Sequence, residues 1–183
     1  IDTGDYIKPA TGLGQSKALS LLAPSLVEAH KDVDLDRVYF SSHVAGNGLE
    51  QDMLLIGGPK NNQITRLIIE SVGSNFGVEQ TGSLIMADGS TFEGVTEDSS
   101  VTYDFGLIIR ATNPFAENHT VVVISGSHTY GVVAAARFFV ESLWIPKHRG
   151  DFAIIVGAKV HQHHVLPPTV IWKSSNKVKS SNG

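Results

Sequence analysis

Two short loops hold most of the residues in this chain that could do chemistry. The first loop carries Gly57 and Gly58, and Asn62, Thr65 and Arg66 follow it. Glycine lets a ligand approach the backbone closely. A helix that starts after such a loop points free amides and its positive dipole end at an anion. Arg66 could donate a bidentate pair of hydrogen bonds to phosphate or carboxylate, so these residues favour binding of an anionic small molecule.

The first loop also has a purely structural explanation. Pro59 suits a helix N-terminus, because its missing N–H would be unpaired there anyway. Either Asn61 or Asn62 can cap the helix by accepting a hydrogen bond from a backbone amide. A Gly-Pro turn and an asparagine cap would therefore start a helix without any ligand, and both interpretations stay open.

The second loop places an imidazole among hydroxyl groups, between two glycines. Its sequence, GSHTYG, comprises Gly126, Ser127, His128, Thr129, Tyr130 and Gly131. We expect these polar groups to face the same side as the first loop. The glycine spacing is that of a P-loop, but Val132 and Val133 replace the required Lys and Ser or Thr, so P-loop ATP hydrolysis is not expected. The G-x-G-x-x-G dinucleotide pattern is absent too, and a tight strand-to-helix turn is the structural alternative.

Acid–base chemistry by histidine is the enzymatic alternative. His128 and His43 each lie beside hydroxyl residues, and either could act as acid or base on a nucleotide or nucleoside. A Ser–His hydrolase would also need an exposed nucleophile and an orienting acid, and no G-x-S-x-G frame is present. Asp52, Asp104 and Asp151 each precede an expected strand, where aspartate is common, so we do not expect a catalytic set.

The segment HQHH is the strongest candidate for a metal site. Strand periodicity would place His161 and His163 on one face and His164 on the other. Two imidazoles could bind zinc or nickel, but they lack an obvious carboxylate partner. A solvated polar segment is therefore expected there. Because the chain has no cysteine, disulfides and thiolate metal sites are excluded, and no motif identifies a cofactor.

Each loop lies between a short apolar run and a helical pattern. Residues 53–56 and 121–124 are continuous apolar runs, typical of strands buried on both faces. Helices are expected over residues 64–72 and 131–139. Loops of this kind lie at the carboxyl ends of strands, which is where open α/β sheets bind ligands.

The other segments predict a single α/β domain over residues 1–172. Residues 16–30 show a helical stripe interrupted by Pro24, which predicts a kink or two short helices. Asp88-Gly89 predicts a hairpin, within a β-rich insert at 77–104. Further strands are expected at 37–41, 84–86, 91–93, 101–104, 105–111, 152–156 and 165–172. The strand at 165–172 contains two prolines, which confine it to a sheet edge. The predicted architecture is a Rossmann-like mixed sheet with a parallel core, helices on both faces, a β-hairpin insert and a flexible tail at 173–183.

Composition narrows the classes of partner. The 183 residues are 42% hydrophobic and 17% charged, which suits a globular domain. A net charge of −4 without a basic stripe gives no electrostatic support for a nucleic-acid partner. No apolar run approaches the roughly 18 residues that a membrane span needs. Because the chain begins at Ile1 and not at Met, we expect a processed or excised piece. The macromolecular partners left open are the other domains of a larger multidomain protein and further copies of this chain in a homo-oligomer. The compartment is open, with the cytoplasm slightly favoured over the cell surface.

A longer pattern resembles a little-characterised prokaryotic module. Its parts are GGP-x-x-N-x-x-TR from Gly57, DFGLI from Asp104, NPF from Asn113, and G-x-x-x-x-G from Gly126 with alanines at 134–136. This frame, over residues 54–139, is similar to Rossmann-like domains of bacterial multidomain proteins and to domains of archaeal surface-layer proteins. The resemblance implies a fold but no particular activity. Where such domains have Gly-Thr, this chain has Gly131-Val132, which removes one hydroxyl.

Three functions are therefore open. The best supported is a domain that binds or senses an anionic small molecule, such as a nucleotide, through both loops. The second is a structural or interaction module of a cell-surface protein, which would associate through the sheet edge near 165–172. The third is a nucleotide- or nucleoside-processing enzyme, for which the sequence offers no complete catalytic set.

Overall fold

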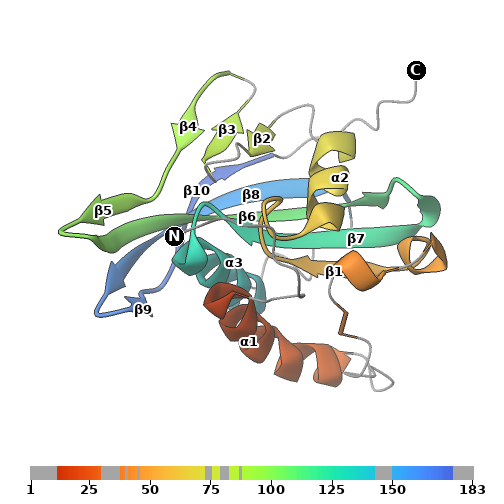
Figure 1. The fold of residues 1–183 in the computed structure, drawn as a ribbon, viewed down its shortest axis with the longest axis horizontal. Helices are drawn as coiled ribbons and strands as arrows, with labels where there is room; N and C mark the ends of the chain where they lie inside the picture. The colour runs from red at the N-terminus through yellow and green to blue at the C-terminus, as the bar shows by residue number, and fades with distance from the viewer. Residues whose placement is uncertain are drawn as a thin grey trace.

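The computed structural model describes residues 12–29, 38–39, 41–44, 46–72, 76–78, 83–86, 88–142 and 150–174. A seven-stranded sheet with the path β1-β7-β6-β8-β10 forms its centre (Figure 1). Its strands are β1 (Met53–Ile56), β5 (Val95–Glu97), β6 (Ser100–Asn113), β7 (Ala116–Gly126), β8 (Phe152–His161), β9 (His164–Val165) and β10 (Thr169–Lys173). A second, three-stranded sheet contains β2 (Phe76–Val78), β3 (Leu84–Met86) and β4 (Thr91–Phe92).

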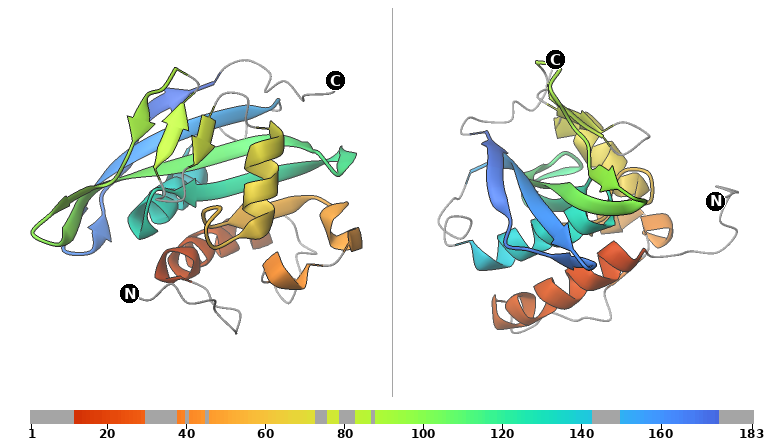
Figure 2. Two further views of the ribbon diagram at one scale, coloured as in Figure 1. Left: turned by 45° about the horizontal axis from the view of Figure 1, so that its top comes forward. Right: turned by 90° about the vertical axis from the view of Figure 1, so that its left-hand side faces the viewer.

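Helices cover both faces of the large sheet, as predicted (Figure 2). They are α1 (Leu13–Ala29), α2 (Gln63–Val72) and α3 (Thr129–Glu141), and the short 3-10 helices η2 (Ser41–His43) and η3 (Gly46–Leu49) precede β1. Helices α1 and α3 lie on one face, and α2 lies on the other. Pro24 lies inside α1, which is one continuous helix. Of the two expected alternatives, the division into two helices is wrong, and the kink stays a prediction. No helix in the described ranges is long and apolar enough to cross a membrane.

The strand directions correct the expected parallel core. Among the described strands, parallel pairing is limited to β1 and β7. The pairs β7–β6, β6–β8 and β8–β10 are all antiparallel. The β6–β7 pair is antiparallel because the NPF turn joins the two strands, and there Asn113 Oδ1 accepts a hydrogen bond from Phe115 N at 2.9 Å. A turn this tight can join only antiparallel neighbours, so the α/β class and the mixed sheet are confirmed while the parallel part shrinks to one pair.

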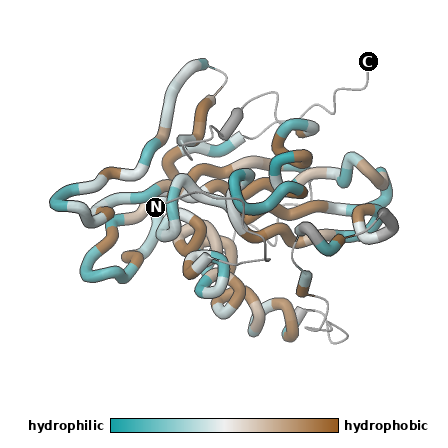
Figure 3. The backbone as a smooth tube through the Cα atoms, viewed as in Figure 1, coloured by the Kyte–Doolittle hydropathy of each residue, from teal (hydrophilic) through white to brown (hydrophobic). Residues whose placement is uncertain are grey.

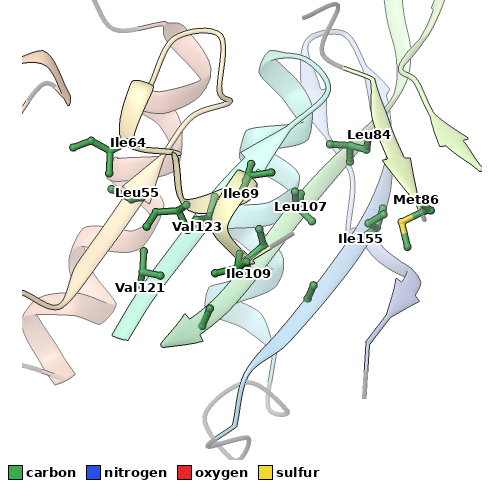
Figure 4. Packing of buried hydrophobic residues seen from close by; sticks show 14 residues of the cluster. Leu55, Ile64, Ile69, Leu84, Met86, Leu107, Ile109, Val121, Val123 and Ile155 are labelled. Carbon is green, nitrogen blue, oxygen red and sulfur yellow. The ribbon is translucent and has the colours of Figure 1, made fainter. Parts of the chain in front are cut away.

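Alternating residues of the central strands fill one apolar core on each face of the sheet. Leu107 and Ile109 of β6 pack with Val121 and Val123 of β7 against α2 (Figure 4). Ile108 of β6, between them in sequence, faces α1 and α3 instead. This follows from the two-residue period of a strand. Apolar residues accordingly concentrate along the strands, and polar ones at the connections (Figure 3).

The apolar run of β1 is covered on both sides, as its composition predicts. Leu55 belongs to the core under α2, and Leu54 and Ile56 pack against the core under α1 and α3. The expected helices at 64–72 and 131–139 are confirmed within α2 and α3. The strand expected at 152–156 lies within the longer β8.

Several predicted strands have different limits from those expected. The stretches 101–104 and 105–111 form one strand, β6. The 165–172 segment divides into β9 and β10, and β10 lies at the end of the sheet path, so the edge prediction is confirmed. Within the described part of 37–41, residues 38–39 are irregular and Ser41 begins η2, so a strand there is wrong. Of the predicted tail, Lys173 ends β10, and 175–183 lie outside the described residues.

The Asp88-Gly89 hairpin is confirmed between β3 and β4. Gly89 has φ 84°, a left-handed conformation that glycine adopts without strain. Asp88 accepts hydrogen bonds from the hydroxyl and amide of Ser90, and these lower the pKa of its carboxyl from the ordinary 3.8. Within the 77–104 insert, β3 and β4 belong to the small sheet, whereas β5 pairs with β6 of the large one.

Candidate ligand site at the ends of β1 and β7

Parts of the two predicted loops meet at the carboxyl ends of the parallel strands β1 and β7. Gly57 N donates to Ile124 O at 2.9 Å, which ties the first loop to the end of β7. A Cβ placed on Gly58 would lie 3.6 Å from Ser125 Oγ and 3.7 Å from Gly126 O. These distances are ordinary van der Waals contacts. We call the place where Gly57 and Gly58 touch Ser125 and Gly126, with the adjoining start of α2, the loop junction.

The first loop is shaped by Gly57 and Asn62. Gly57 has φ 110° and is buried, so its conformation requires glycine. Asn62, not Asn61, caps α2, because its Oδ1 accepts from Thr65 N at 3.0 Å. Pro59 lies in the turn before this cap and not in the helix, which begins at Gln63. The asparagine cap thus explains the helix start.

Two hydroxyls near this turn remain without a hydrogen-bond partner within the described part of the chain. They are Thr65 Oγ1 and Ser125 Oγ, both on fully buried residues. A buried polar group left unpaired costs about 1–3 kcal/mol. Groups of this kind in a native structure call for a water, an ion or a ligand as partner. The loop junction therefore contains polar groups that the described protein does not satisfy.

Arg66 supplies a positive charge just beyond the capped start of α2. Its backbone N donates to Asn62 O at 3.2 Å, which places it in the first turn of the helix. The residue is exposed. Within the described ranges its guanidinium has no ion-pair or hydrogen-bond partner. It is therefore available to an anion at this end of the molecule.

The second loop is organised by Asp104, a residue that the sequence analysis set aside. Its carboxylate is fully buried under the start of α3. Oδ2 accepts from Gly131 N at 2.5 Å, and Oδ1 accepts from Ser127 Oγ at 2.6 Å and from Phe105 N at 2.9 Å. His128 Nδ1 lies 3.5 Å from the same Oδ1. One buried carboxylate thus holds the whole turn from strand to helix.

One expectation for Asp104 is wrong, because it lies inside β6 and does not precede a strand. Ser127 is buried and donates its hydroxyl to Asp104, and its role in ligand binding stays a prediction. Asp104 lies two residues before Gly106 and four before Ile108, which face α3. In one continuous strand, the alternation of side chains would therefore predict that Asp104 also faces α3. The prediction of two separate strands, 101–104 and 105–111, hid this alternation.

His128 and Thr129 are the exposed polar residues of the second loop. The His128 side chain is 39% exposed, and Thr129 begins α3 at the surface. A Cβ on Gly94 would lie 2.5 Å from His128 Nδ1, so the segment between β4 and β5 passes directly over the imidazole. Both Asp104 and this backbone therefore lie next to Nδ1 of the ring. Gly126 and Gly131 are buried against each other and serve packing.

The N-terminus of α1 forms a third side of the site, which the sequence did not indicate. A Cβ on Gly57 would lie 2.5 Å from Gln15 Nε2. A Cβ on Gly14 would lie 2.6 Å from Thr129 O. Helix α1 therefore touches both loops at its first turn, and the Gln15 carboxamide lies against the loop junction.

The other candidate histidines lie in different surroundings. His43 is exposed on η2, which contacts α2. The expected shared face of His161 and His163 is wrong, because β8 ends at His161 and His163 has φ 65° in the turn to β9. His163 Nδ1 instead lies 2.7 Å from Tyr130 Oη, at the start of α3. The described residues contain no group of three metal-ligating side chains.

The site therefore combines a helix start, an arginine, two unsatisfied hydroxyls and an imidazole oriented by a carboxylate. These groups supply positive charge and hydrogen-bonding partners, which are the chemistry that a polar anionic molecule requires. Ser127 donates its hydroxyl to Asp104 and not to His128, so a Ser–His nucleophile is not assembled. Comparison of the chain with protein-family models, with curated proteins and with solved structures finds no match.

Proposed function

We propose that this protein binds or senses an anionic small molecule, such as a nucleotide, at the loop junction. The observation that carries the proposal is the pair of buried hydroxyls, Ser125 Oγ and Thr65 Oγ1, without partners in the described chain. Ser125 Oγ faces the Gly58 turn. Both hydroxyls lie on fully buried residues, so a ligand would satisfy their hydrogen bonds by displacing part of the glycine turn that covers Ser125.

The electrostatics of the first loop support an anion. Helix α2 is ten residues long, and its N-terminus carries a partial positive charge from the aligned peptide dipoles. Arg66 adds a full charge on the first turn. The proposal includes the Rossmann-like relationship, since the two strand–loop–helix units stand on parallel neighbours, as in dinucleotide-binding folds.

The first test is a thermal-shift screen against nucleotides, nucleotide sugars, phosphate and divalent metals, followed by calorimetry on Arg66→Ala. A ligand at about 100 times its Kd should add about 2.7 kcal/mol to the free energy of unfolding. Arg66→Ala should weaken binding tenfold or more, because a charge-assisted hydrogen bond contributes about 1.5–3 kcal/mol.

Arg110→Ala is the matched control for this experiment. Arg110 donates to Gly150 O at 3.0 Å, toward the opposite end of β6. Removing its charge should leave ligand affinity unchanged. Equal losses of affinity in both variants, or no loss in Arg66→Ala, would contradict the assignment of the anion to α2.

A second candidate function is an interaction module, as in a cell-surface protein. Edge strand β10 exposes Val170 by 44% and Ile171 by 42%, and an unpaired strand edge can pair with another chain. A flat ligand screen together with concentration-dependent sedimentation would favour this function.

A third candidate is an enzyme that acts on nucleotides or nucleosides. The Asp104–His128 pair favours it, and it requires turnover that His128→Ala abolishes.

A further inference from the structure

Resting on the proposed binding function, we infer that the ligand carries a single phosphate on a hydroxyl-bearing body, as in a sugar phosphate or a nucleoside monophosphate. The phosphate lies at the start of α2, beside Arg66 and the hydroxyl of Ser125. The hydroxyl groups of the body face His128. The two loops differ in their charge. The first loop is open to an anion, whereas the second loop already contains the Asp104 carboxylate.

The second loop already holds its own anion. Gly131 N, in the first turn of α3, donates to Asp104 Oδ2 at 2.5 Å. The Ser127 hydroxyl is used by the same carboxylate at 2.6 Å. Asp104 is fully buried, and nearby like charges oppose each other strongly where water is excluded. A phosphate at the start of α3 would meet this charge and would find the Gly131 amide occupied.

The first loop has no such built-in anion among the described residues. Its cap is the neutral carboxamide of Asn62, which accepts from Thr65 N at 3.0 Å. Ser125 is fully buried, and its Oγ has no partner within the described chain and faces Gly58 at 3.6 Å from the Cβ position. Arg66 is exposed on the same helix turn. The single phosphate therefore belongs here.

His128 gives the second loop a preference for hydroxyl groups. Its Nδ1 lies 3.5 Å from Asp104 Oδ1, so Nε2 is the ring nitrogen that is left to exchange a hydrogen bond with a ligand hydroxyl group. His128 follows Gly126 by two residues, so it lies within roughly 7 Å of the loop junction along the chain. Thr129 is exposed, and the Gln15 carboxamide lies against Gly57, so both add neutral polar groups beside the two loops.

This arrangement excludes a diphosphate that spans both loops. In dinucleotide folds a pyrophosphate receives free amides from a helix start, whereas here the Gly131 amide is satisfied by Asp104. A second phosphate directed toward the second loop would not gain the Gly131 amide and would approach a buried carboxylate. A monophosphate should therefore bind at least as tightly as the corresponding diphosphate.

The test is calorimetry at constant ionic strength with four probes: inorganic phosphate, ribose 5-phosphate, AMP and ADP. We expect AMP to bind at least as tightly as ADP, and ribose 5-phosphate to bind more tightly than inorganic phosphate. His128→Ala should weaken ribose 5-phosphate binding about threefold to tenfold, as for one neutral hydrogen bond, and leave inorganic phosphate within about twofold. His128→Gln, which keeps a hydrogen-bonding side chain, should retain part of the affinity.

His119→Ala is the matched control. His119 Nδ1 lies 3.5 Å from Asp52 Oδ1, and its side chain is 40% exposed, so it repeats the His–Asp pairing near the other end of β7. This variant should bind every probe like the unmodified protein.

The outcomes separate the inference from the proposed function. Tenfold tighter binding of ADP than of AMP, or no effect of His128→Ala on ribose 5-phosphate, would overturn the ligand class. Arg66-dependent binding of inorganic phosphate would still support the proposed function in that case. Absence of binding by all four probes at millimolar concentration would overturn the ligand class, and a flat thermal-shift screen in addition would overturn the proposed function.

Discussion

Asp104 is the single side chain on which the geometry of the second loop depends most. It accepts hydrogen bonds from two backbone amides and one hydroxyl, and it faces an imidazole. A buried carboxylate is tolerated only when donors surround it in this way. The same donors fix the path of the chain from β7 into α3, so one residue both shapes the loop and sets its charge.

Asp104→Ala should lower the free energy of unfolding by about 3 kcal/mol or more. The change leaves the Ser127 hydroxyl and the amides of Phe105 and Gly131 without their acceptor, and each buried unpaired group costs about 1–3 kcal/mol. Urea denaturation followed by circular dichroism measures the loss.

The control for Asp104 is Asp88→Ala. Asp88 also accepts two hydrogen bonds, both from Ser90, but it lies fully exposed on the β3–β4 hairpin. Water can replace its bonds, so the denaturation midpoint should shift far less. Equal shifts in the two variants would show that burial of Asp104 is unimportant.

At the scale of elements, the close approach of α3 to β6 depends on glycine. A Cβ on Gly131 would overlap the carbonyl oxygen of Phe105, and a Cβ on Gly106 would overlap the backbone of Gly131. The alanines at 134–136 continue this close contact and are fully buried. The small residues bring the start of α3 near enough for Asp104 to reach the Gly131 amide.

Gly131→Ala should therefore destabilise the protein by about 1–3 kcal/mol, because the added methyl group meets backbone that cannot rotate away. For a chain of this size the melting temperature should fall by roughly 2–12 °C. Differential scanning calorimetry measures this.

Gly58→Ala is the comparison for Gly131. Its added Cβ would have only ordinary contacts, at 3.6 Å and 3.7 Å, so the melting temperature should stay unchanged. If the ligand approaches this turn closely, the variant should lose affinity while it keeps its stability. A large drop in melting temperature for Gly58→Ala, or none for Gly131→Ala, would contradict the packing described above.

At the scale of the whole molecule, one sheet separates two apolar cores, and α1 forms the outermost layer on one face (Figure 2). Ala18 and Leu22 attach α1 to the core it shares with α3. This docking also brings Gln15 to Gly57 and Gly14 to Thr129. The outer helix is thus coupled to both loops of the site.

Leu22→Ala should lower the free energy of unfolding by about 2–5 kcal/mol, the usual range for a buried leucine. Leu22 is 1% exposed, whereas its neighbour Leu21 is 38% exposed. Leu21→Ala is therefore the matched control, and it should change stability by less than about 1 kcal/mol. Equivalent unfolding curves for the two variants would mean that α1 does not dock through Leu22.

The sequence by itself determined several of the elements and the end of the sheet where the two loops meet. Apolar runs and helical stripes are local patterns, so β1, α2, α3 and the hairpin at Gly89 could be predicted. The asparagine cap of α2 was predictable for the same reason, since Asn62 and Thr65 are near neighbours.

Only the tertiary structure decided the strand directions and the role of Asp104. The NPF turn folds β7 back along β6, and a two-residue period carries no information about direction. The partners of Asp104 lie 23 and 27 residues away along the chain, and Gln15 reaches Gly57 only because α1 docks on α3. Contacts between residues far apart in sequence depend on how the elements pack, and no local pattern encodes that packing.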